Sequence, residues 1–70
     1  MNIISELAGI VSRIAVSPDQ NISQGQELLI IDAMKMEIPV DAPITGRVAE
    51  IFVAQGDAVS EGQLLARLQA

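Results

Sequence analysis

The sequence contains no cysteine, histidine, tryptophan or tyrosine, and only one phenylalanine and one lysine. Without cysteine, neither a disulfide nor a thiolate metal site can support the fold. Without histidine or cysteine, the side chains that most often serve as general base or strong nucleophile are missing. The carboxylates are scattered among expected turns and never reach the spacing of a calcium loop. We therefore expect no metal site and no enzyme that acts alone.

Positive charge is also scarce, since four arginines and lysines face nine carboxylates and give a formal net charge of −5. This excess of acid would repel phosphates and anionic lipid headgroups, so we expect neither nucleic acid nor a membrane as partner. The apolar run Leu28–Ile31 is far too short to cross a bilayer, and the N-terminus lacks the basic and apolar regions of a secretory signal. We expect a soluble, cytoplasmic protein.

Apolar residues nevertheless make up 50% of the chain, which is far more than a disordered acidic tail contains. Because aromatic residues are nearly absent, the core must be built from isoleucine, valine, leucine and alanine. Seventy residues are enough for one small domain and not for two. We predict a single domain over residues 1–70.

The strongest pattern is an internal repeat at an offset of 37 residues. Residues 9–16 read GIVSRIAV and residues 46–53 read GRVAEIFV, with a glycine, a valine, an isoleucine and a second valine in register. Further along, ISQGQEL at 22–28 matches VSEGQLL at 59–65. The chain therefore consists of two copies of one structural plan.

The two halves, residues 3–32 and 40–69, are joined by the segment 33–39. Both halves contain short β-branched runs between turn residues and lack the apolar spacing of a helix. Val48 and Ile51 lie three residues apart and would point to opposite faces of a flat strand, so we predict a bulge there. Strands that bend between two layers favour a flattened barrel or sandwich. An approximate two-fold axis would place the joining segment opposite both termini.

One turn differs between the two copies. Gly56 and Asp57 predict a tight turn in the second half, where the first half has Asp19 in place of the glycine. Aspartate is one of the few residues that tolerate a positive φ angle. We therefore expect the turn to survive in both halves.

The joining segment holds the only lysine, within the run Ala33-Met34-Lys35-Met36. An apolar run precedes it, and an alternating run follows in which Ile38 and Val40 share one face. This arrangement predicts a β-hairpin with Lys35 at its tip, although no glycine, asparagine or aspartate specifies the turn type. Most tip lysines are simply solvated, and methionine often fills gaps in a core. Exposed apolar side chains in a row, however, usually serve recognition.

At these residues the chain resembles the biotin-attachment domains of biotin-dependent carboxylases and decarboxylases, members of the biotinyl/lipoyl family. The resemblance implies an all-β barrel-sandwich hybrid, a flattened barrel of two four-stranded antiparallel sheets with pseudo-two-fold symmetry. It also implies biotin attached covalently to Lys35. The resemblance rests on Ala33-Met34-Lys35-Met36, Glu37, Ala42-Pro43, Gly46 and Val48.

The resemblance further implies the role of a biotin carboxyl carrier that performs no catalysis. A biotin protein ligase would attach biotin, and Ala33, Met34 and Met36 would be the flanking recognition residues. The carrier would then shuttle carboxybiotin between a biotin carboxylase and a carboxyltransferase. Two departures from the family pattern stand out, because Asp32 occupies a position where many members have glutamate and Glu6 replaces the expected proline.

Two alternatives use the same fold. A lipoyl-bearing acyl carrier domain would also present a tip lysine, but lipoyl sites typically have an acidic residue directly before it, where this chain has Met34. An unmodified structural hairpin module would not require a lysine at the tip. The methionines on both sides of Lys35 favour biotin.

Overall fold

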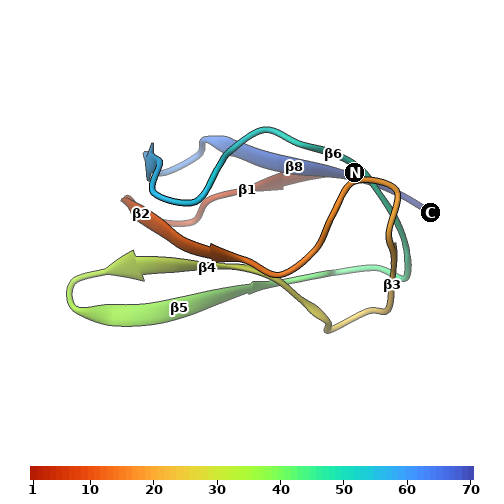
Figure 1. Cartoon of the computed structure of the whole chain (residues 1–70), viewed down its shortest axis with the longest axis horizontal. Coiled ribbons are helices and arrows are strands. Elements are labelled where there is room, and N and C mark those ends of the chain that lie inside the picture. The colour runs from red at the N-terminus through yellow and green to blue at the C-terminus, as the bar shows by residue number, and fades with distance from the viewer.

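The computed structural model describes all 70 residues and contains strands and turns but no helix. It therefore has no helix that could cross a membrane. The strands form two layers that both extend along the long axis of the molecule and face each other across it (Figure 1). They are β1 (Asn2–Ile4), β2 (Gly9–Ile14), β3 (Asn21–Ile22), β4 (Glu27–Ala33), β5 (Met36–Asp41), β6 (Gly46–Ile51), β7 (Ala58–Val59) and β8 (Leu64–Gln69).

The order of the strands shows the repeat directly. One sheet has the order β1-β8-β6-β3 and the other has the order β5-β4-β2-β7, and all pairs are antiparallel. Exchanging each strand for its counterpart 37 residues away turns one order into the other. The predicted hybrid of two four-stranded antiparallel sheets is confirmed. Each sheet contains strands from both halves, so neither half can form a sheet of this kind alone.

Strand β6 contains a bulge where the sequence predicts one, and its repeat counterpart β2 contains a bulge at the matching position. The pairing of β6 with β8 shifts in register between Val48 and Glu50, and that of β2 with β4 shifts between Val11 and Arg13. Because of the extra residue, Val48 is fully buried and Ile51, three positions later, also packs against the core. A bulge of this kind bends its strand and increases the local twist.

The glycines that begin β2 and β6 are required by close packing. A Cβ atom on Gly9 would lie 2.6 Å from the carbonyl oxygen of Asp32, and one on Gly46 would overlap the carbonyl oxygen of Gln69. Only a residue without a side chain lets β2 approach β4, and β6 approach β8, this closely. Gly9 therefore lets β2 lie directly beside the end of β4.

The turn that differs between the halves has the same geometry in both. Gly56 has a φ angle of 94° and Asp19 one of 68°. The amide of Gly56 donates a hydrogen bond to the carbonyl of Val11, and that of Asp19 donates to the carbonyl of Val48, both at 2.7 Å. The prediction that aspartate can take the place of this glycine is confirmed.

The interior holds two clusters of buried side chains, and every member is aliphatic. The second cluster reaches Ala33, the last residue of β4. The side chains of Val40 and Ile51 pack against both clusters and connect them. The first cluster contains Ile3, Val16, Ile22, Leu28, Ala42, Val48, Ala66 and Leu68, and the second contains Val11, Leu29, Ile31, Ala33, Val53, Val59 and Leu65.

The molecule measures 32 × 18 × 17 Å along its principal axes. The β4–β5 hairpin forms one end of the long axis, and both chain termini lie at the other (Figure 1). This is the arrangement that the repeat predicts. The barrel therefore places the β4–β5 hairpin at the end opposite both termini (Figure 1).

Candidate modification site at the hairpin tip

The tip is a two-residue turn. Ala33 pairs with Met36 at the ends of β4 and β5, which leaves Met34 and Lys35 as the connection. Their φ angles are 53° and 65°. Positive φ at both central positions is the pattern of a type I′ turn, whose twist matches that of the two strands. The predicted hairpin with Lys35 at its tip is confirmed, and the turn forms without any of the residues that usually specify it.

The residues of the tip differ sharply in exposure. Met34 is 94% exposed and Met36 is 63% exposed, and Lys35 between them is also exposed. Ala33 is buried against the core. The methionines are therefore not part of the core, and the tip presents two thioether side chains and one amine to solvent.

Lys35 is the only cationic side chain without an ion-pair partner in the structure. Each of the three arginines forms a salt bridge, at distances of 3.1, 3.1 and 2.7 Å. Lys35 has no salt bridge and donates no hydrogen bond to protein, although two carboxylates lie nearby in sequence. Its amine is free to meet another molecule.

One face of the hairpin is apolar at the tip. On the face of the hairpin that carries the core side chains, Met36 and Ile38 lie nearest the tip. The connection between β1 and β2 brings Leu7 and Ala8 beside them. These side chains line a shallow hollow together with Ala33 and Met34, and all six lining residues are hydrophobic. We call this surface the apolar shelf.

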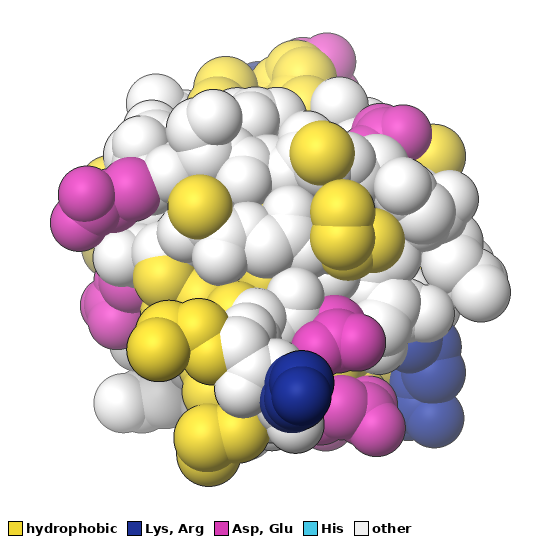
Figure 2. Space-filling model, turned by 90° about the vertical axis from the view of Figure 1, so that its left-hand side faces the viewer, with side chains coloured by type: hydrophobic (Ala, Val, Ile, Leu, Met, Phe, Trp, Pro, Cys, Tyr) yellow, Lys and Arg dark blue, Asp and Glu magenta, His cyan; other side chains and the backbone are white.

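The other face of the hairpin is acidic. Asp32 and Glu37 lie directly opposite each other in the β4–β5 pairing, and both are exposed. The hydroxyl of Ser12 lies 3.5 Å from a carboxylate oxygen of Glu37. Figure 2 looks onto this end of the molecule and shows a cationic side chain between hydrophobic side chains on one side and acidic ones on the other. Like charges in direct cross-strand contact destabilise a sheet, so stability does not explain this pair.

The sequence does not predict two contributors to the site, Leu7 and Ala8. They lie more than twenty residues before the tip and reach it only because β2 pairs with β4. The residue closest to them that could have pointed to this contact is Gly9. A Cβ atom added to Gly9 would lie 3.2 Å from the Cβ atom of Ala33. This close packing marks the place where β2 lies beside the end of β4, next to the tip.

The chemistry available to the tip is that of a presented amine. No group of three or more carboxylates is arranged to hold a metal ion. No hydrogen-bonded base contacts Lys35, so a separate enzyme would have to activate its amine. The fold and the tip together define the class of the protein as a carrier domain, in which a barrel presents one hairpin with an exposed amine.

Comparisons with known proteins identify the carrier more closely. A family model described as "Biotin-requiring enzyme" matches residues 1–68. The "Biotin/lipoyl attachment protein" of Bacillus subtilis (strain 168) is 38% identical over 68 residues, which cover 97% of this chain and 93% of that protein. The chain therefore belongs to the biotin/lipoyl attachment family, as the sequence predicts, and it is a domain of the biotin-carrier type.

Larger proteins contain a similar domain. The "Methylcrotonoyl-CoA carboxylase subunit alpha, mitochondrial" of Arabidopsis thaliana is 37% identical over 67 residues, which cover 96% of this chain and 9% of that protein. The urea carboxylase of Kluyveromyces lactis matches with a TM-score of 0.93 and 30% identity, over 99% of this chain and 6% of the carboxylase. The chain thus spans less than a tenth of the length of these carboxylases.

Proposed function

We propose that this chain is a biotin carboxyl carrier and that a separate biotin protein ligase attaches biotin to Nζ of Lys35. The observation that carries the proposal is the position of the only lysine. It lies exposed and unpaired at the tip of the hairpin, between two exposed methionines, in a chain of the biotin/lipoyl attachment family. In the ligase reaction the amine would attack the acyl carbon of biotinyl-adenylate, an amide bond would form, and AMP would leave.

The residues around Lys35 fit such a group. The amine has no protein partner to give up, and its neighbours at the tip are exposed. Met34 and Met36 offer polarizable apolar contacts on both sides of the lysine, which suits recognition by a ligase. Ala33 would help to position the turn, because its small side chain packs beside Gly9 and lets the turn lie close to the barrel.

The carrier role follows from tethering. Attached biotin would carry a carboxyl group from a biotin carboxylase to a carboxyltransferase, the two partners of the proposed carrier. A tethered group meets two active sites far more often than a free one, because the tether sets a high effective concentration. In this proposal the chain itself holds the attached biotin and presents it to the partners. The catalytic residues belong to those partners.

The proposal also places the carrier in the cytoplasm with its ligase. Cell fractionation followed by streptavidin blotting tests this location.

An in vitro reaction with two ligases tests the cofactor. We expect purified biotin ligase with ATP and biotin to label the chain, and lipoate ligase with ATP and lipoate to label it much more slowly. The family name includes lipoyl attachment, so the second arm is the necessary comparison. Preferential lipoylation would contradict the proposal and support the lipoyl alternative.

A further inference from the structure

A groove of about 300 Å³ runs between β1 and β5 and adjoins the apolar shelf. These two strands are the edges of their sheets, and they are equivalent in the internal repeat. The groove therefore lies where the pseudo-two-fold axis brings the two halves together. Its lining residues are Asn2, Ile3, Ile4, Glu6, Leu7, Ile31, Ile38, Pro39, Val40, Asp41 and Pro43.

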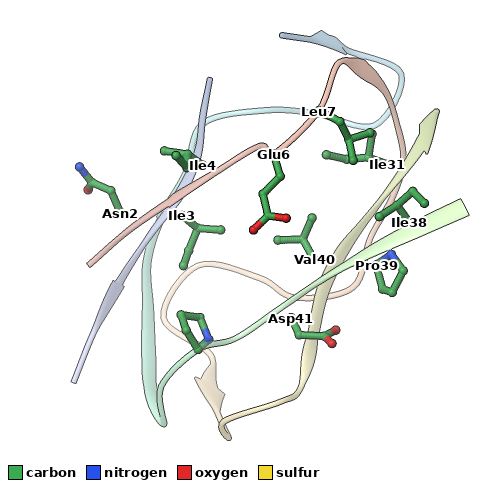
Figure 3. Close-up of a pocket in the computed structure, with 11 residues that line it drawn as sticks. Asn2, Ile3, Ile4, Glu6, Leu7, Ile31, Ile38, Pro39, Val40 and Asp41 are labelled. Atoms are coloured by element: carbon green, nitrogen blue, oxygen red, sulfur yellow. The ribbon is translucent and has the colours of Figure 1, made fainter. Parts of the chain in front are cut away.

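The two halves differ in this groove by two carboxylates. Glu6 stands where the repeat has Pro43, and Asp41 stands where the repeat has Ile4. In Figure 3 the Glu6 side chain lies between the residues of β1 and those of β5, and Asp41 lies on the β5 side. Neither carboxylate forms a salt bridge, and no arginine or lysine lines the groove. The groove thus combines apolar walls with two unpaired negative charges.

The edge of β5 is poorly suited to pairing with a further strand. Pro39 lies in the middle of this edge strand and has no amide hydrogen to donate. A charged residue, Asp41, ends the same strand, and both features are typical of edges that resist strand addition. The groove is therefore more suited to a side chain from a partner than to an extended backbone.

We propose that this groove receives an arginine side chain from a protein partner that engages the hairpin tip. The aliphatic part of arginine suits the apolar walls, and its planar guanidinium has five donors with which to meet both Glu6 and Asp41. The groove is continuous with the tip, because Leu7 and Ile38 line both the groove and the apolar shelf. A partner bound to the apolar shelf would therefore lie next to the groove and could place a side chain in it. This contact goes beyond biotin attachment and does not require it.

A peptide titration followed by NMR tests the groove. The 15N-labelled chain is titrated with Ac-Leu-Arg-Leu-NH2 and, separately, with the same peptide containing citrulline, which keeps the shape of arginine but has no charge. We expect saturable shifts of the amide signals of Ile3, Leu7 and Val40 with the arginine peptide only. Equal responses to both peptides, no response, or shifts confined to Asp32 and Glu37 would overturn the proposal.

Charge variants locate the contact. Glu6→Gln is expected to weaken binding of the arginine peptide by about threefold, as for one partly exposed charge pair, and Asp41→Asn by a similar factor. Glu61→Gln is the matched control, because Glu61 is exposed, unpaired and outside the groove. Equal weakening in Glu61→Gln and Glu6→Gln would show attraction to net charge alone and would overturn the assignment. A spectrum of each 15N-labelled variant recorded without peptide confirms that the variant is folded.

Discussion

At the scale of single residues, the tip holds its backbone in a conformation that its side chains disfavour. Met34 and Lys35 both have positive φ angles, and each L-residue in this region costs roughly 1–2 kcal/mol. The sequence predicts the hairpin but not this turn, because the register that pairs Ala33 with Met36 sets the turn and leaves only two residues for it. Such strain persists where the surroundings impose it, often at functional sites.

Replacing Met34 with glycine tests this strain. Glycine has no Cβ to strain at positive φ, and the 94% exposed side chain gives up little packing, so we expect the free energy of unfolding to rise by about 0.5 kcal/mol. The same variant should accept biotin more slowly, because the proposed ligase contact is lost. Urea unfolding and timed biotinylation measure the two effects. Lower stability would contradict the strain argument, and an unchanged rate would contradict the recognition role.

At the scale of strands and turns, local patterns predict much of the structure and none of the contacts between distant elements. The spacing of Val48 and Ile51 is enough to predict a bulge, since side-chain direction alternates along a strand. The apolar shelf could not be predicted, because Leu7 and Ala8 reach the tip only after β2 has paired with β4. Its formation therefore depends on how closely β2 approaches β4.

Alanine at Gly9 or Gly46 tests that close approach. The added methyl group meets backbone carbonyl oxygens in β4 and β8, which cannot move aside as a flexible side chain can. We expect each substitution to lower the free energy of unfolding by about 1–3 kcal/mol. Thermal or urea denaturation measures the loss, with the exposed Ser60→Ala as control. Stability equal to that of the control in either glycine variant would be inconsistent with this packing.

At the scale of the whole molecule, the repeat accounts for the architecture. The repeat predicts two equivalent halves and the position of the tip, and the bend at Val48 and Ile51 predicts the flattened barrel. The structure shows that the same offset of 37 residues relates the two sheet orders. The groove between β1 and β5 was not predicted. Glu6 and Asp41 lie far apart in sequence, and they line one groove only because the edges of the two sheets face each other.

Paired core substitutions test the equivalence of the halves. Leu28 and Leu65 are repeat counterparts, and each is almost completely buried, one in each cluster. We expect Leu28→Ala and Leu65→Ala each to destabilise the fold by about 2–5 kcal/mol, as for leucine deletions in other cores. Urea unfolding at low temperature provides the measurement. A small effect at one position and a large effect at the other would argue against two structurally equivalent halves.

The most direct test of the central claim is the intact mass of the chain and of Lys35→Arg after co-expression with biotin ligase. We predict one biotinyl group on every wild-type chain and none on the variant, because Lys35 is the only lysine. The exposed substitution should change the free energy of unfolding by less than about 0.5 kcal/mol, so loss of the label cannot be ascribed to unfolding. Biotin retained by Lys35→Arg, or a wild-type chain that stays unlabelled beside an active ligase, would contradict the account.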